Sequence, residues 1–308
     1  MNDAALAEVL EEVRRIDVLY GRLLTDLMAG AYTSVFRGSG IEFDRVREYA
    51  EGDDPRTVDW NVTARVGRPF VRTYVDEREL TMLFLLDLSP SMDTGFGAWS
   101  ARQTAARICA CLALAASRNG DKVGLVAFGE GVERFVPPKR GAGHALRIIR
   151  DCLALPSARG RTDLAPALRF AARVVRRRAA VFVVSDFLAD GWRDALSLCA
   201  RRHDVIAVRI LAPELEPSES GGFDPGGTML RVRDPESGGE TLVDWASPRV
   251  RGAYRDRVAR WRAATDDALR RANVDRMDVP VPRTADRNAI ARPVLRFFRM
   301  REVRGEKR

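Results

Sequence analysis

The regular alternation of apolar strands and helices between residues 80 and 211 restricts the possible fold more than any other feature. The stretches LTMLFLLDL, AAVFVVSDF and HDVIAVRIL are nearly continuous apolar runs, and helical patterns separate them. Strands that are apolar on both faces are typical of parallel sheets covered by helices on each side. The sequence therefore predicts an α/β protein with a doubly wound, mostly parallel, Rossmann-like sheet.

The remaining elements of this region follow from the same patterns. DKVGLVAF and VERFVP are joined at Gly129 and Gly131, which predicts an antiparallel hairpin and hence one antiparallel strand in the sheet. We expect helices at about 100–118, 143–154, 164–177 and 190–202. Further on, MLRVRD and ETLVDW predict a second hairpin, followed by a polar helix at 248–273, the strand VDRMDV and a last helix ending in VLRFFRMR.

The chain divides into three parts by composition. Residues 1–77 combine an amphipathic helix over residues 3–28 with a segment rich in glycine, proline and aspartate, which predicts short strands and turns rather than a second helix. Residues 78–300 form the sheet domain, with a hairpin insertion at about 213–245, and residues 301–308 are a basic tail. In the first part, we expect Trp60 to anchor the segment to the core.

Composition excludes several classes of protein. The net charge is +8, but the basic residues are almost all arginines interleaved with acids, which indicates solvated helix faces rather than a nucleic-acid surface. No run approaches the roughly 20 apolar residues of a membrane span. The first residues lack the pattern of a secretory signal, so we expect a cytoplasmic protein without an integral membrane segment. The four cysteines lie in apolar runs and are expected to be buried, reduced thiols.

Oxygen-bearing side chains are expected at three consecutive carboxyl strand ends of the sheet. The first strand ends in Asp87, with Ser89 and Ser91 at alternate positions after it. Thr162 lies in the loop GRTDL, and Asp186 ends the strand AAVFVVSDF. Ligands of doubly wound sheets bind beyond the carboxyl ends of the strands, where the strand order reverses. We therefore expect these five residues to converge there.

The chemistry of this set points to a hard cation. Carboxylate and hydroxyl oxygens, without sulfur or imidazole, suit Mg²⁺ or Mn²⁺ in a site completed by water. Few direct negative charges would leave the cation able to bind a carboxylate from another molecule.

Each residue also has a purely structural interpretation. Asp87 is a possible cap of the following turn, and Ser89 and Ser91 are possible turn residues. Thr162 is well placed as an N-cap, and Asp186 as an acid at the start of a helix. Arg47, Arg56 and Arg65 either contact an acidic partner or form salt bridges with nearby acids. These alternatives do not explain why all three loops fall at one expected edge of the sheet.

The ordered pattern D-x-S-x-S at Asp87, Ser89 and Ser91, then Thr162, then Asp186, resembles the von Willebrand factor A domain with its metal-ion-dependent adhesion site. The resemblance covers about residues 78–212, with 274–299 completing the sheet. It implies that these five residues are metal ligands, some of them through water.

The stretch from GSGIEFDRVREYAEGDDPRTVDWN to LFLLDLSPSM is similar to the DUF58 family of bacterial proteins, over about residues 36–300. This resemblance implies a MoxR-type AAA+ ATPase, or its client, as the partner, and a role in chaperone-like maturation or assembly of other proteins.

Two functions from different classes follow. The first is a non-enzymatic protein that binds Mg²⁺ and uses it to hold an acidic residue of a partner. The alternative is a Mg²⁺-dependent phosphatase or phosphotransferase of the haloacid dehalogenase type. That class needs a second aspartate where this chain has Ser89, and a lysine in a later loop, whereas Lys122 and Lys139 fall in unsuitable surroundings. No dinucleotide-binding or P-loop motif is present.

Overall fold

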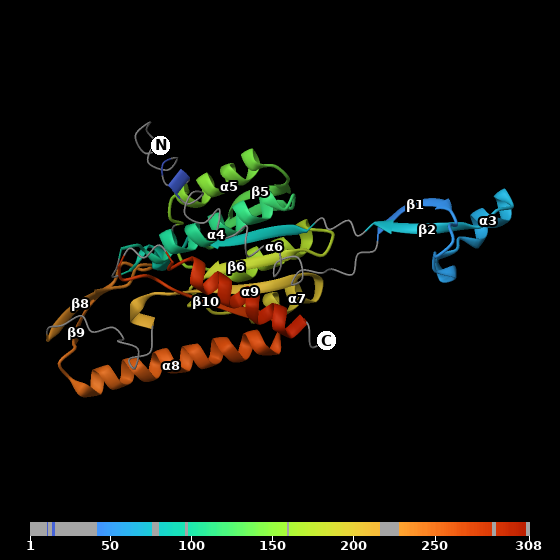
Figure 1. Ribbon diagram of the computed structural model, residues 1–308. Helices are drawn as coiled ribbons and strands as arrows, with labels where there is room; N and C mark the ends of the chain where they lie inside the picture. The colour runs from blue at the N-terminus through green and yellow to red at the C-terminus, as the bar shows by residue number, and fades with distance from the viewer. Residues whose placement is uncertain are drawn as a thin grey trace. The chain divides into compact units, whose positions relative to one another are not determined.

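The computed structural model divides the chain into two compact units (Figure 1). One unit comprises residues 36–79, and the other contains residues 80–308 together with residues 1–35. The structure describes residues 11, 14, 15, 42–75, 80–95, 98–158, 160–215, 228–284 and 288–305. The expected helix at 3–28 lies almost entirely outside these residues.

A six-stranded sheet forms the centre of the larger unit, with the strand order β10-β7-β6-β3-β4-β5. All neighbouring strands run parallel except β4 and β5, which pair antiparallel. The strands are β3 (Thr81–Asp87), β4 (Lys122–Phe128), β5 (Val132–Lys139), β6 (Ala180–Ser185), β7 (Asp204–Leu211) and β10 (Asp275–Pro280). The predicted fold class and its single antiparallel strand are confirmed.

Helices cover both faces of this sheet. They are α4 (Ala101–Arg118), α5 (Ala142–Ala154), α6 (Leu164–Val174), α7 (Arg193–Arg202), α8 (Pro248–Arg271) and α9 (Ala291–Gly305). On one face, odd-numbered β3 residues such as Leu83 and Leu85 pack in one core with α6, α7 and Leu269 of α8. On the other face, α4 contacts the sheet and packs against α5. Alternate residues of a strand face opposite sides, so this explains why β3 must be apolar throughout.

The helix α4 shows how local signals set an element's limits. Ser100 and Gln103 form a reciprocal capping box at its start. Its small residues are buried from Ala101 to Ala116, which lets the helix lie close to the sheet. Cys109 and Cys111 are in this buried run, and all four cysteines are free and buried, as predicted.

A separate hairpin and the long helix α8 follow β7. The hairpin strands β8 (Met229–Arg233) and β9 (Glu240–Asp244) pair antiparallel and form a two-stranded sheet of their own. The fully buried Arg209 of β7 forms ion pairs with Asp266, near the C-terminal end of α8, and with Asp278 of β10. These pairs fix α8 against the sheet edge, because a buried arginine must have its charge compensated.

The unit of residues 36–79 is built on the antiparallel pair of β1 (Glu42–Glu48) and β2 (Phe70–Val75). A 3-10 turn (Pro55–Thr57) and the short helix α3 (Trp60–Val66) connect them. Asp59 caps α3 by accepting hydrogen bonds from the backbone N–H groups of Asn61 and Val62. The expectation of strands and turns alone is therefore wrong for residues 60–66, where this cap and Gly67 delimit a helix.

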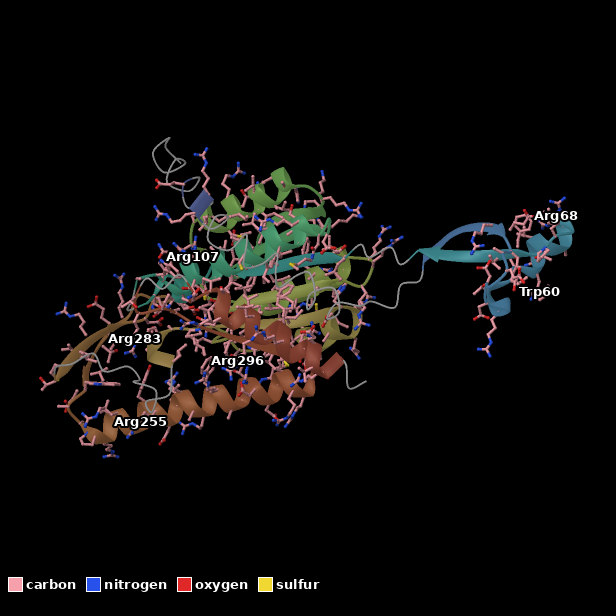
Figure 2. The ribbon with its side chains drawn as sticks, in the orientation of Figure 1. Trp60, Arg68, Arg107, Arg255, Arg283 and Arg296 are labelled. Carbon is pink, nitrogen blue, oxygen red and sulfur yellow. The ribbon has the colours of Figure 1, made fainter. Side chains whose placement is uncertain are left out.

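Side chains of this unit bear on two further expectations. Trp60 lies on the first turn of α3 and is not buried within its own unit, being 72% exposed (Figure 2); its expected contact with the core of the larger unit stays a prediction. Arg47 forms the predicted salt bridge, with two hydrogen bonds to Asp53 of 2.6 and 2.7 Å. Arg56 and Arg65 are exposed and form no ion pair with any described residue.

Within the described part of the chain, no helix is both long enough and apolar enough to span a bilayer. The helix α9 continues to Gly305, into the stretch expected as a basic tail.

Candidate metal centre

The candidate site lies where β3 and β6 end side by side. From β3 the chain proceeds through α4 to β4 on one side, whereas β6 leads through α7 to β7 on the other. The strand order therefore reverses between β3 and β6, and their carboxyl ends form the switch point at which ligands of such sheets bind. Asp87 is the last residue of β3, and Asp186 follows the last residue of β6.

The turn after β3 brings its three predicted residues together. One carboxylate oxygen of Asp87 accepts the backbone N–H of Ser89 at 2.8 Å, which folds the chain back at the strand end. A 3-10 turn from Pro90 to Asp93 follows, fixed by the fully buried Met92. The hydroxyl oxygens of Ser89 and Ser91 are 3.0 Å apart. Asp87 thus caps this turn, as one alternative predicted, but with only one of its oxygens.

Two further hydrogen bonds join this turn to the end of β6. The Ser91 hydroxyl donates to Asp186 Oδ2 at 2.7 Å, across 95 residues of sequence. The Ser185 hydroxyl donates to the second oxygen of Asp87, Oδ2, at 2.6 Å. Four of the five predicted residues therefore form one connected group: Asp87, Ser89, Ser91 and Asp186.

The direction of these hydrogen bonds leaves oxygen lone pairs available. Ser91 has a single hydroxyl proton, and it is donated to Asp186. In the contact between the two serines, Ser89 must then be the donor. Both hydroxyl oxygens keep acceptor capacity, as a metal ligand requires.

The fifth predicted residue, Thr162, is not hydrogen-bonded to the other four. Its loop joins α5 to α6 and follows no strand, so its expected place at a strand end is wrong. The N-cap of α6 is Asp163, whose carboxylate accepts the N–H of Ala165 at 2.8 Å, so the interpretation of Thr162 as this cap is wrong. The Thr162 hydroxyl instead donates to Glu236 of the β8–β9 turn at 2.9 Å. Its loop is tied to the β3 turn by the Ala158 N–H, which donates to the Leu88 carbonyl at 2.8 Å.

Asp186 is also not a helix-start acid. The helix α7 begins only at Arg193, and one oxygen of Asp186 instead accepts the N–H of Leu188 at 2.9 Å. The other oxygen receives Ser91, so the carboxylate faces the β3 turn.

The two aspartates are deeply buried carboxylates. Asp87 is fully buried and Asp186 is 5% exposed. Burial, together with the nearby charge of Asp186, raises the pKa of Asp87 to about 7, although hydrogen bonds from Ser185 and Ser89 lower it. Burial also raises the pKa of Asp186, and the charge of Glu236 acts in the same direction.

These carboxylates lack a positive partner within the described residues: no arginine or lysine pairs with Asp87 or Asp186 there. Nearby, burial and the charge of Asp186 raise the pKa of Glu214, and no described group hydrogen-bonds its buried Oε2 atom. An all-oxygen donor set with uncompensated negative charge fits a hard divalent cation. Among the described residues, no group of three or more His, Cys, Asp and Glu side chains is placed to hold a metal ion. The candidate site is not such a group, because two of its four connected residues are serines.

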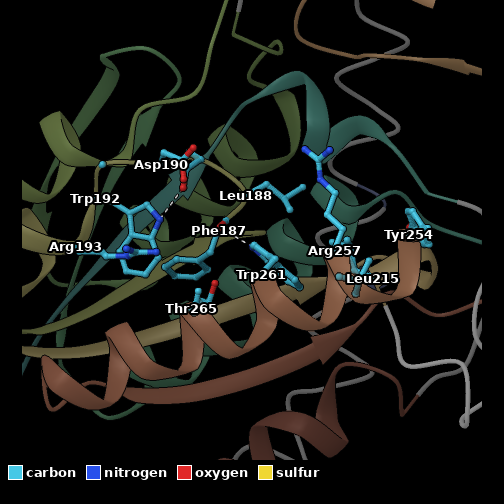
Figure 3. Close-up of a pocket in the computed structure, with 14 residues that line it drawn as sticks. Phe187, Leu188, Asp190, Trp192, Arg193, Leu215, Tyr254, Arg257, Trp261 and Thr265 are labelled. Carbon is cyan, nitrogen blue, oxygen red and sulfur yellow. Dashed lines mark hydrogen bonds between the residues drawn. The ribbon is translucent and has the colours of Figure 1, made fainter. Parts of the chain in front are cut away.

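Sequence reasoning missed two residues that shape the site. Ser185 directly precedes Asp186 in the sequence, and its side-chain role depends on a contact with Asp87, 98 residues away. Phe187 adopts a left-handed backbone conformation (φ 59°), unusual for a bulky residue. Its ring packs edge-on against Trp192, and its carbonyl accepts the Trp261 Nε1–H of α8 at 3.0 Å (Figure 3).

Phe187 and Trp261 both line a pocket. The pocket has a volume of about 330 Å³ and lies between the loop after β6 and α8 (Figure 3). Its wall is aromatic and partly polar, with Tyr254 and Arg257 on the helix side. The helix α8 therefore supports the backbone of the loop that carries Asp186.

The comparisons with known proteins identify the family. The model of the family described as "Protein of unknown function DUF58" matches residues 45–264. An uncharacterized protein of Mycobacterium tuberculosis is 33% identical over 242 residues, which cover 77% of this chain and 73% of the relative. An uncharacterized protein of Mycobacterium bovis matches to the same extent. The chain belongs to the DUF58 family, as its sequence predicts.

Solved structures of low sequence identity are similar over part of the chain. The conserved hypothetical protein BatB from Bacteroides thetaiotaomicron is 16% identical, with a TM-score of 0.45, over 72% of this chain and 98% of that one. A von Willebrand factor type A protein from Catenulispora acidiphila is 16% identical, with a TM-score of 0.37, over 76% of this chain and 43% of that one. Proximal thread matrix protein 1 from the mussel byssus, described with a zinc-occupied adhesion-site motif, is 17% identical, with a TM-score of 0.33, over 43% of this chain and 38% of that one.

Proposed function

We propose that this DUF58 protein is a non-enzymatic interaction protein that binds Mg²⁺ or Mn²⁺ at the ends of β3 and β6 and holds a partner's acidic side chain there. The observation that carries the proposal is the hydrogen-bonded group of Asp87, Ser89, Ser91 and Asp186. Two strand ends contribute to it, and its charge is uncompensated among the described residues. Thr162 is the fifth proposed ligand, from the loop before α6.

The residues have distinct roles in this proposal. Asp87 and Asp186 supply the negative charge, while the serine and threonine hydroxyls supply neutral oxygens that do not saturate it. When bound, the cation supplies net positive charge and a coordination position open to a further carboxylate. Ser185 and the N–H of Ser89 hold the two oxygens of Asp87 in a fixed orientation.

The nature of the partner rests on the resemblance of the sequence to the DUF58 family. That resemblance favours a MoxR-type AAA+ ATPase, or a client of one, in chaperone-like maturation or assembly. Any ATP turnover would then belong to the partner, because this chain has no P-loop motif.

The arrangement of the lysines disfavours the phosphatase alternative. Lys122 opens β4 opposite Thr81, the first residue of β3. Lys139 pairs with Val123 at the same edge. Both described lysines therefore lie at the opposite end of the strands from Asp87, and Ser89 stands where that class needs an acid.

Calorimetry with Mg²⁺ and Mn²⁺ tests the metal part of the proposal. The wild type is expected to bind one ion, and Asp87→Ala is expected to abolish binding while the circular dichroism spectrum stays native. Asp256→Ala removes an exposed carboxylate from α8 and serves as the matched control. Absence of divalent-ion binding by the wild type, or equal binding by Asp87→Ala, contradicts the proposed site.

A pull-down of a MoxR-type ATPase in magnesium and in chelator tests the partner. We expect recovery only in magnesium, and none with Asp87→Ala. If the ATPase is not recovered in either buffer, the partner is wrong even where the metal binds.

A further inference from the structure

The turn between β8 and β9 reaches the strand-end site with a single side chain. Among residues 231–242, Glu236 alone is partly buried, and every other residue is exposed. The Glu236 carboxylate accepts the hydroxyl of Thr162 at 2.9 Å, across 74 residues of sequence. In Figure 1 the hairpin lies at the end of the sheet where β3 and β6 terminate. The hairpin thus contacts Thr162, the fifth proposed ligand, through Glu236.

The turn itself is ordered around Asp234, which presents Glu236 in a fixed position. Asp234 accepts the backbone N–H of Glu236 at 3.0 Å through its side chain, and the N–H of Gly238 at 2.8 Å through its carbonyl. Gly238 takes a left-handed conformation (φ 72°) that closes the turn. The Ser237 hydroxyl also donates to Asp234. Such a turn limits the positions that the Glu236 side chain can reach.

The position of Glu236 brings a further carboxylate toward the site. Its partner Thr162 lies in the loop that is bonded to the β3 turn, where the Ala158 N–H donates to the carbonyl of Leu88, the residue after Asp87. Like charges at short range repel, and the repulsion is stronger where solvent is excluded. A surface turn could avoid this cost by pointing the acid into water, as its exposed neighbours do. A cation between the carboxylates removes the repulsion.

We infer that Glu236 is a further residue of the metal site, which supplies from within the chain the carboxylate that the site otherwise takes from a partner. This inference rests on the proposed metal-binding function. Thr162 connects Glu236 to the site, because its hydroxyl donates its proton to Glu236 and keeps its lone pairs for the cation. A partner's acidic residue must then displace the β8–β9 turn.

Two measurements with Mn²⁺ and Mg²⁺ alone test this role. Glu236→Gln keeps an acceptor for Thr162 but removes the charge, so we expect Mn²⁺ affinity by calorimetry to fall roughly tenfold. The relaxation rate of water protons at bound Mn²⁺ is expected to rise, because a coordination position becomes open to water. Glu240→Gln removes a charge from an exposed residue of the same hairpin and is the matched control; it is expected to behave as wild type.

Hydrogen–deuterium exchange gives a readout that does not depend on affinity. Mg²⁺ is expected to slow exchange in residues 234–240 of the wild type and of Glu240→Gln, but not of Glu236→Gln. If all three proteins bind Mn²⁺ equally and the turn exchanges equally with and without Mg²⁺, Glu236 has no part in the site. That outcome overturns this inference and leaves the proposed function intact, whereas a wild type that binds no divalent ion refutes both.

Discussion

Ser185→Ala tests whether the ends of β3 and β6 form one interdependent site. Ser185 is fully buried and takes part in two hydrogen bonds. Its hydroxyl donates to Asp87 Oδ2 at 2.6 Å and accepts the Phe187 N–H at 3.0 Å. The first bond involves a carboxylate, which makes it stronger than a bond between neutral groups.

The expected loss follows from these two bonds. A hydrogen bond to a charged group contributes about 1.5–3 kcal/mol, and a buried donor left without an acceptor costs about 1–3 kcal/mol. Because the two losses share one side chain and the site relaxes, we expect a total of about 3 kcal/mol. For a unit of this size, 1 kcal/mol shifts the Tm by roughly 2–4 °C, so the Tm is expected to fall by roughly 6–12 °C.

Thermal unfolding followed by circular dichroism, in chelator, measures this loss. Calorimetry separates a positioning role from a merely structural one, since a mispositioned Asp87 is expected to lower Mg²⁺ affinity by roughly 10- to 100-fold. Ser197→Ala is the control: this exposed serine of α7 donates only to the Arg193 carbonyl, so its Tm should change little. A Ser185→Ala protein with unchanged Tm and unchanged Mg²⁺ affinity would refute the described coupling between the strand ends.

Three other predictions concern features around and beyond the site. Gly129→Ala would place its methyl 2.2 Å from the Cβ atom of Ala158, which lies in the loop that leads to Thr162. Chemical denaturation should show that this substitution destabilises the fold by about 1–3 kcal/mol. Gly131→Ala is the control and should be neutral, because its added methyl meets open space. Burial raises the pKa of Cys111 and of Cys199 to about 12, so intact-mass spectrometry after iodoacetamide at pH 8 should find the native protein unmodified; rapid alkylation would contradict this burial. The hydrogen bond from Arg47 lowers the pKa of Asp53 below its ordinary value of 3.8. The pair therefore stabilises its unit above pH 3.8 and loses this contribution as the pH falls through the lowered pKa. A carboxyl-carbon NMR titration should find the lowered pKa of Asp53 in the wild type but not in Arg47→Gln.

The sheet could be predicted because its strands carry their own signal. β3 and β6 are apolar on both faces, and only a sheet covered on both sides buries such strands. The convergence of Asp87, Ser89 and Ser91 followed from the same reasoning, because the strand end and the following turn are local in sequence.

Features that depend on distant contacts could not be predicted in this way. Thr162 and Asp163 are both good cap residues, and only the position of Glu236 shows how the Thr162 hydroxyl is used. Trp60 looked like a core residue by type, but burial needs a partner surface, and the described part of its small unit offers none. Ser185 and Glu236 gain their roles from contacts with Asp87 and Thr162 that periodicity does not encode.

Anomalous diffraction from crystals grown with Mn²⁺ tests the central claim most directly. A single strong peak is expected beside the carboxylates of Asp87 and Asp186 and the hydroxyls of Ser89 and Ser91. A map without a peak there at millimolar Mn²⁺, or with its only peaks elsewhere on the chain, would contradict the proposed metal centre.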